Sequence, residues 1–211
     1  DAPPHGSVCF HPSLLPAFRG GAALSWQIIE GATESGISVF QPDEGVDTGP
    51  LYLQRGGVPI EPTDTMASLY FDQLYPMGVE AMVETVAAID TGTATLTPQR
   101  SEGASFQGLI DDAAARLDLG EPLARVERRI RGCDPSPGAW AELSGEPIRL
   151  FGCSVESTTA PGAPAGTILA ADEAGLRLAV EGGTLRIAKV RRDAGKVPAA
   201  EAGLAIGDRL V

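Results

Sequence analysis

Membrane proteins and nucleic-acid-binding proteins are both disfavoured by what is scarce in this 211-residue sequence. No apolar run is long enough to cross a bilayer, because the longest comparable stretch, 78–89, is interrupted by Glu80 and Glu84. Positive charge is also scarce, with 16 Lys and Arg against 28 Asp and Glu and a formal net charge of -12. A phosphate backbone would be repelled by such a chain unless its cations gathered on one face.

Cysteine and histidine are rare as well. The three cysteines, Cys9, Cys133 and Cys153, are odd in number and widely spaced, which fits neither a disulfide framework nor a paired-cysteine metal site. Reduced thiols in a cytoplasm are therefore expected. The chain begins at Asp1 without a methionine or a basic segment followed by an apolar one, so we expect a cut N-terminus and no secretory signal.

One basic cluster stands out against the acidic background. Its members are Arg125, Arg128, Arg129 and Arg131, at helical spacing. A solvated helix face is the favoured interpretation, and a ligand site is the alternative.

The first part of the chain alternates between strand-like and helix-like segments. An apolar strand at 8–15 is followed by an amphipathic helix at 22–30 with Gly31 as its C-cap. Residues 36–41 and 51–54 then have the pattern of two further strands. This alternation predicts an α/β layer.

A longer helical region comes next. Thr65 or Asp64 is placed to cap a helix, which Pro76 interrupts before a second apolar run ends near Ile89. We expect one kinked helix or two in succession.

The composition changes after about residue 97. Residues 98–141 are predicted to be a linker with one bridging helix, and residues 142–211 a separate β domain. Short β-like runs separated by turn residues have the spacing of a small barrel or sandwich; they lie at 148–155, 166–170, 176–180 and 185–190. We therefore predict three segments, 1–97, 98–141 and 142–211.

Two features are candidates for chemistry. His5 lies in a Pro- and Gly-rich start and is interpreted as a solvated loop residue, whereas His11 follows a strand, where open α/β sheets place ligands. An acidic loop at 43–49 follows the next strand and is by itself an ordinary turn or a weak cation site. Calcium ligands would have to alternate along such a loop, and these carboxylates do not.

His11 and Asp47 together predict a proton-handling pair. A carboxylate on the neighbouring strand end would hold one imidazole nitrogen while the other faces substrate. Ser13 lies near His11 in the sequence but in no nucleophile-elbow pattern, so covalent acyl transfer is not favoured. Cys9 shares a strand face with His11, which leaves a thiol mechanism as a minor option.

These residues resemble the signature of the folate-dependent formyltransferases. The run from His11 to Pro16 with Arg19-Gly20, followed by Asp47-Thr-Gly49, matches that signature in letters and in spacing. Further similar segments extend over nearly the whole chain: Ile130-Arg-Gly132 with Pro137-Gly-Ala-Trp140 in the interdomain region, and Gly166-Thr-Ile-Leu169 with Gly183-Thr-Leu-Arg-Ile187 in the C-terminal domain. Within the family, the hydrolase domain of 10-formyltetrahydrofolate dehydrogenase is a nearer likeness than methionyl-tRNA formyltransferase.

The resemblance implies an α/β, Rossmann-like formyltransferase core whose N-terminal half is missing, followed by a small OB-like β-barrel. It also implies that the transferases have an asparagine amide two residues before the histidine, which stabilises an oxyanion, where this chain has Cys9. The dehydrogenase-type domain resembles this chain in lacking that asparagine.

The activity implied by the resemblance is transfer of the formyl group of 10-formyltetrahydrofolate to an amine of a small metabolite. The alternatives are hydrolysis to formate, formylation of methionyl-tRNA, and a non-catalytic folate-binding module. His11 and Asp47 would be catalytic, Cys9 and Ser13 would contact substrate, and no metal is expected. The folate would lie against Pro42, Asp43, Glu44 and Gly45. The partners are then folate and a small acceptor, with tRNA a minor alternative, and an oligomer is compatible with the sequence.

Overall fold

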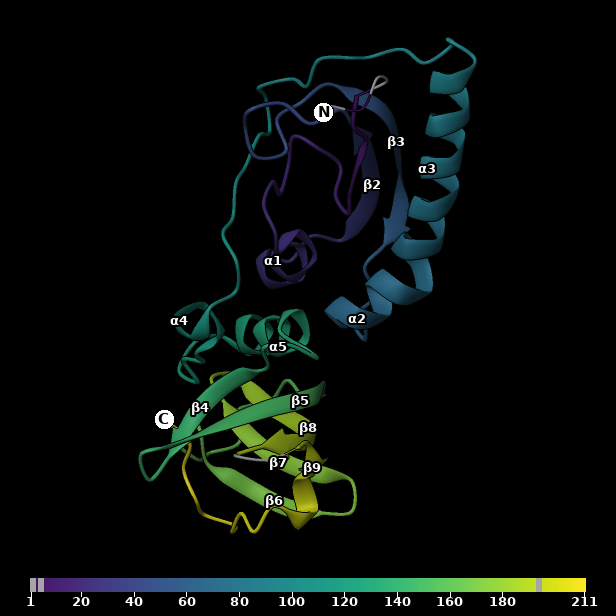
Figure 1. Ribbon diagram of the computed structural model, residues 1–211. Coiled ribbons are helices and arrows are strands. Elements are labelled where there is room, and N and C mark those ends of the chain that lie inside the picture. The colour runs from purple at the N-terminus through teal and green to yellow at the C-terminus, as the bar shows by residue number, and fades with distance from the viewer. Residues whose placement is uncertain (1–2, 4–5, 193–194) are drawn as a thin grey trace. The chain divides into compact units, whose positions relative to one another are not determined.

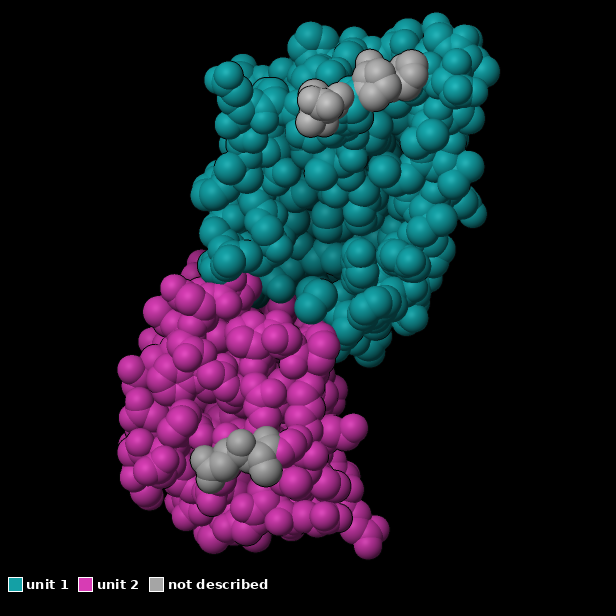
Figure 2. All heavy atoms as spheres, in the orientation of Figure 1, with its two compact units in different colours: residues 1–109 teal, residues 110–211 magenta. Residues whose placement is uncertain are grey.

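The protein was examined as a computed structural model that describes Pro3, residues 6–192 and residues 195–211. His5, interpreted above as a solvated loop residue, lies outside the described residues. The chain divides into two compact units, residues 1–109 and residues 110–211, which are coloured separately in Figure 2.

The first unit contains a three-stranded antiparallel sheet in the order β1-β2-β3. Its strands are β1 (Cys9–His11), β2 (Glu34–Phe40) and β3 (Leu51–Pro59). Strands and helices alternate as predicted, but the strand pairings are antiparallel, unlike the parallel pairings of a Rossmann-type layer. The loop 41–50 reverses the chain between β2 and β3 and so brings it back to the edge of the sheet.

Helix α1 (Ala23–Glu30) confirms the predicted helix at 22–30. Leu24 and Ile28 recur at helical spacing and are buried, which gives the helix its inner face. Gly31 ends it in the left-handed conformation, at φ 79°, and its N–H donates to the carbonyls of the last turn.

The predicted interrupted helix is present as three successive segments, α2 (Met66–Ser68), the π-helix η1 (Leu69–Leu74) and α3 (Tyr75–Asp90). Thr65 caps α2 in a reciprocal capping box with Ser68. Pro76 is the second residue of α3, which comes directly after the π-helix η1, so the irregular turn lies beside the residue that lacks an N–H.

The core of the first unit lies between these helices and the sheet, and α3 packs against β2 and β3 (Figure 1). Its buried members come from α1, both longer strands and the helical region; they are Leu24, Ile28, Ile37, Val39, Val58, Leu69, Leu74 and Ala81. Tertiary packing of these residues fixes the strand ends that carry the candidate site.

The second unit contains helices α4 and α5 and a six-stranded sheet. The elements are α4 (Asp112–Ala115), α5 (Leu123–Gly132), β4 (Ala139–Leu143), β5 (Glu146–Ser157), β6 (Ile168–Asp172), β7 (Gly175–Val180), β8 (Gly183–Arg191), β9 (Val197–Pro198) and the 3-10 helix η2 (Ala199–Glu201). Helix α5 lies where a helix was predicted, and it packs within the second unit against β5 and β8. The four predicted strands correspond to β5, β6, β7 and β8, whereas β4 and β9 were not predicted.

The sheet of the second unit is open, so the predicted closed barrel is wrong. Its strand order is β4-β5-β8-β7-β6, with β9 beside β8, and β4 and β6 are not paired with each other. The segment 208–211 meets each edge only locally, through Glu142 and Val211 on β4's side and through Ile168 and Asp208 on β6's side. Isolated hydrogen bonds of this kind do not form the continuous ladder that closure requires.

Segment 98–141 is divided between the two units. Residues 98–109 pack with the first unit and residues 110–141 with the second. Thr97 exchanges two backbone hydrogen bonds with Leu51 of β3, which fixes the start of this segment against the sheet.

Among the residues that the structure describes, no helix has the length and apolar character to span a membrane. Within the same residues, no group of three or more His, Cys, Asp or Glu side chains is arranged to hold a metal ion.

Candidate active site

His11 ends β1 and is buried, with only 6% of its surface exposed. Its Nε2 lies 2.8 Å from the carbonyl oxygen of Phe18. Because a carbonyl only accepts, Nε2 carries a proton and donates it in this bond. The proton that His11 can gain or lose is therefore on Nδ1.

Asp47 reaches the same place from the loop between β2 and β3. Its Oδ2 accepts a hydrogen bond of 2.7 Å from the N–H of Gly20 and lies 3.6 Å from Nδ1 of His11. The residue has φ 53°, in the left-handed region that side chains other than glycine seldom adopt. Such strained positions concentrate at functional sites.

The sequence-based prediction that His11 and Asp47 lie together is confirmed by this geometry, while their catalytic role stays a prediction. The prediction that the second ring nitrogen is free to face the substrate differs from the structure. Nε2 is bonded to Phe18, and Nδ1 faces Asp47. A separation of 3.6 Å is longer than an ordinary hydrogen bond. A third polar atom bridging Nδ1 and Oδ2 would complete the bonding of both groups.

Two glycines of the motif are required by close backbone approaches. A Cβ on Gly20 would lie 2.1 Å from the carbonyl oxygen of Gln107, and one on Gly49 would lie 1.8 Å from that of Gln41. Both distances are far inside van der Waals contact, so any side chain there would displace the loop. The glycines after Arg19 and Thr48 are thus explained by packing around the site.

Cys9 lies two residues before His11 on β1 and is partly exposed. Burial raises the pKa of its thiol, and the negative charge of Asp47 raises it further. The thiol is therefore protonated at neutral pH, which does not favour a nucleophilic role. As a protonated group it is a weak hydrogen-bond donor beside the pair.

Ser13 is fully buried and its hydroxyl donates to the carbonyl of Ala17 at 2.7 Å. This bond commits the side chain to its own loop. The substrate contact predicted for Ser13 stays a prediction.

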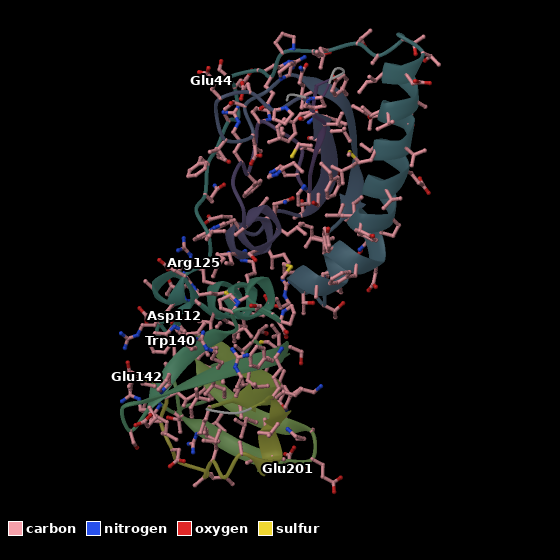
Figure 3. All side chains as sticks on the ribbon, viewed as in Figure 1. Glu44, Asp112, Arg125, Trp140, Glu142 and Glu201 are labelled. Carbon is pink, nitrogen blue, oxygen red and sulfur yellow. The ribbon has the colours of Figure 1, made fainter. Side chains whose placement is uncertain are left out.

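The loop predicted to hold the folate is exposed from Pro42 to Val46, and Glu44 is labelled on it in Figure 3. Asp43 stabilises the loop by accepting from the hydroxyl of Thr48 at 2.6 Å and from the N–H of Gly45 at 3.0 Å. The bond from Thr48 is the main cause of the lowered pKa of the Asp43 carboxyl. That carboxylate thus has a structural role, whereas folate binding by this loop stays a prediction.

Sequence analysis missed two polar residues beside the site. Gln99 donates to the backbone carbonyls of Asp47 and Gly49, and Ser105 accepts from the N–H of Phe18. Both residues lie in a polar segment without helical or strand periodicity, so no pattern in the sequence connects them with His11 or Asp47.

Comparison with protein families finds two matches in this chain. Residues 1–86 match the model of the formyl transferase family, and residues 109–205 match that of the formyl transferase C-terminal domain. Together the two matches include His11, Asp47 and most of the second unit.

Individual relatives agree with these matches. The chain is 44% identical over 161 residues to the mitochondrial 10-formyltetrahydrofolate dehydrogenase of Mus musculus, covering 76% of this chain and 17% of the relative. It is 37% identical over 196 residues to the methionyl-tRNA formyltransferase of Bordetella petrii, covering 92% of this chain and 60% of the relative. The chain thus spans only part of the length of either protein.

A solved structure is similar to both units. HypX from Aquifex aeolicus in complex with tetrahydrofolic acid matches with a TM-score of 0.76 and 25% identity. The match covers 92% of this chain and 34% of HypX.

Proposed function

The chain belongs to the formyl transferase family, and we propose that it removes the formyl group from 10-formyltetrahydrofolate at a site built around His11 and Asp47. The observation that carries this proposal is the approach of Nδ1 of His11 to Oδ2 of Asp47, at 3.6 Å, between two segments far apart in the sequence. An imidazole beside a carboxylate is suited to moving a proton near neutral pH.

In the proposed mechanism, a nucleophile attacks the formyl carbon and forms a tetrahedral oxyanion. Asp47 accepts the proton that the nucleophile loses, and His11, protonated on Nδ1, donates toward the oxyanion. Collapse of the intermediate breaks the bond from the formyl carbon to the folate nitrogen, and this nitrogen takes up the proton that Asp47 accepted, so that tetrahydrofolate leaves and Asp47 is again a carboxylate. Nε2 stays bonded to the Phe18 carbonyl throughout and keeps the ring oriented.

The folate is proposed to lie against the loop from Pro42 to Asp47. The loop is exposed from Pro42 to Val46, so its backbone can be reached by a pterin, although the N–H of Gly45 is already donated to the side chain of Asp43. The tetrahydrofolic acid bound by HypX supports a folate ligand for this fold.

For the acceptor, we rank water ahead of an amine of a small metabolite. The 44%-identical relative is named for the same folate and for dehydrogenation, and its name includes no amine acceptor. Methionyl-tRNA is ranked third, supported by the 37%-identical formyltransferase and opposed by the net charge of -12.

A product assay separates these candidates. The whole protein would be incubated with 10-formyltetrahydrofolate alone, with a panel of amino sugars and amino acids, and with methionyl-tRNA. We expect tetrahydrofolate and formate from the donor alone. Release only with an amine or with methionyl-tRNA would replace water by that acceptor, and folate binding without release under any condition would support a non-catalytic folate-binding module instead.

A further inference from the structure

Residues 97–107, here called the strap, run past the candidate site in the first unit. They follow α3 and end just before the second unit begins at residue 110. Neither family model matches them, because one match ends at residue 86 and the other starts at residue 109. The strap nevertheless makes hydrogen bonds to both loops that carry the proposed catalytic pair.

Gln99 connects the strap to Asp47. Its Nε2 donates to the carbonyl oxygens of Asp47 and Gly49, each at 2.8 Å, and its Oε1 accepts from Nη2 of Arg19 at 2.7 Å. One partly buried amide thus joins the loop of Asp47 to the loop that follows His11. These three bonds use both donors of the side chain and its acceptor.

Ser105 connects the strap to His11. Its hydroxyl oxygen accepts from the N–H of Phe18 at 2.8 Å, its own N–H donates to Pro16, and its carbonyl accepts from Arg19. Phe18 in turn accepts the hydrogen bond from Nε2 of His11. Ser105 therefore fixes the residue that orients the imidazole.

Both residues that the strap holds have an unfavourable backbone conformation. Phe18 has φ 56° and Asp47 has φ 53°, and no other non-glycine residue described in the first unit has a positive φ. Such conformations persist only where surrounding contacts determine them strongly. The strap supplies such contacts at both positions.

We propose that Gln99 and Ser105 are positioning residues for the proposed reaction: Gln99 holds the backbone of Asp47 and so directs its carboxylate, and Ser105 holds the ring of His11 through Phe18. The proposal rests on the function proposed above. Neither residue needs to touch the folate or the acceptor. Their effect on the reaction comes from fixing the direction in which Nδ1 and Oδ2 face each other, and a misplacement of about 1 Å can cost about 10²-fold in rate.

The first test is Gln99→Ala in the whole protein, with Gln73→Ala on η1 as the matched control. We expect kcat to fall by about 10²-fold with little change in KM for 10-formyltetrahydrofolate. Hydrogen–deuterium exchange at the N–H of Gly20, which donates to Asp47, reports the position of that carboxylate without turnover. This exchange should become faster in Gln99→Ala and stay unchanged in the control.

The second test is Ser105→Ala, with Ser101→Ala in the same strap as its control. We expect kcat to fall by about tenfold, corresponding to the loss of one hydrogen bond. The Nε2 proton of His11, observed by NMR in a His5→Ala background, should exchange faster with water in Ser105→Ala than in the control.

Gln99→Glu keeps the bulk of the side chain and the acceptor for Arg19 but removes both donors, so it serves if the alanine variant does not fold. Wild-type exchange at Gly20 and wild-type kcat in a folded Gln99 variant would overturn the proposed role of Gln99. Unchanged exchange of the His11 proton and unchanged kcat in Ser105→Ala would overturn that of Ser105. If the exchange rates change as expected but the wild-type protein releases no formyl group, the proposed function fails, and only the structural part, that Gln99 and Ser105 orient Asp47 and His11, is supported.

Discussion

The two units differ in how they balance charge. The first unit contains 3 Lys or Arg residues against 13 Asp or Glu, a net charge of -10, whereas the second contains 13 against 15, a net charge of -2. In the second unit, arginines pair with carboxylates of other strands, as Arg177 of β7 and Arg186 of β8 do with Glu156 of β5. In the first unit, the long-range polar bonds around the site run mainly from side chains to loop backbone.

This difference follows from where the backbone groups of each unit find their hydrogen-bond partners. Strand ladders pair the backbone groups along β5, β8 and β7 in the second unit, and charged side chains of these strands pair with one another. The proposed site of the first unit lies on loops, whose backbone groups need other partners. Side chains such as Gln99 supply them and at the same time fix the loops that carry His11 and Asp47.

The largest fall in kcat is expected from changes to the proposed catalytic pair in the first unit, and not from a carboxylate of the second unit. Asp47→Asn and His11→Ala should each lower kcat by about 10²- to 10⁴-fold, because each removes one partner of the proposed proton transfer. Folate binding should remain measurable. Asp172→Asn, which changes a carboxylate paired with Arg186 in the second unit, should leave kcat within about twofold of wild type. Steady-state kinetics and equilibrium folate binding would test this. An equal fall in kcat in all three variants would contradict the placement of the reactive groups in the first unit.

A smaller effect is expected from equivalent core truncations. Ile28→Ala in the first unit and Ile187→Ala in the second each remove a buried side chain, at a cost of about 2–5 kcal/mol in the free energy of unfolding of that unit. Below the unfolding transition, only Ile28→Ala should also lower kcat, since α1 packs in the core behind the site. Thermal unfolding and turnover would be measured on the same samples. A large fall in kcat for folded Ile187→Ala would instead place reactive groups in the second unit.

The smallest effect concerns a thiol. The charge of Asp47 contributes to the raised pKa of Cys9, so Asp47→Asn should lower that pKa toward its ordinary value. More thiolate then forms at any pH below the midpoint, and alkylation of Cys9 should be faster there, by less than about tenfold. Cys133 in the second unit, where burial raises the pKa to about 11, should react at an unchanged rate. Mass spectrometry of alkylation against pH would show this, and an identical Cys9 profile in both proteins would argue that Asp47 lies too far away to act on it.

Much of this organisation could be predicted from local sequence patterns. The cap at Gly31, the capping box at Thr65 and the four main strands of the second unit follow from turn chemistry and periodicity, which depend on neighbouring residues. The approach of His11 to Asp47 could be predicted because His11 ends one strand and Asp47 lies on the loop that follows the neighbouring strand.

The remaining features depend on contacts between distant residues. The open sheet of the second unit and the antiparallel pairing of β1 with β2 are set by contacts between strands. Strand propensity does not indicate which strands pair. The role of residues 98–109 was missed for a similar reason, since Gln99 lies 52 positions from Asp47 and a polar segment without periodicity resembles a linker. Turn residues indicate where a chain bends, but they do not indicate what it bends against.

His11 and Asp47 are proposed to act as a unit, and a double-mutant cycle measures their coupling. Formyl release would be measured for wild type, His11→Ala, Asp47→Asn and the double variant under one set of conditions. Groups that serve the same step are strongly non-additive, so the double variant should be no more than a few fold slower than the slower single variant. If the two losses multiply instead, the two side chains contribute independently, and the proposal that they act as one unit in the same step is wrong.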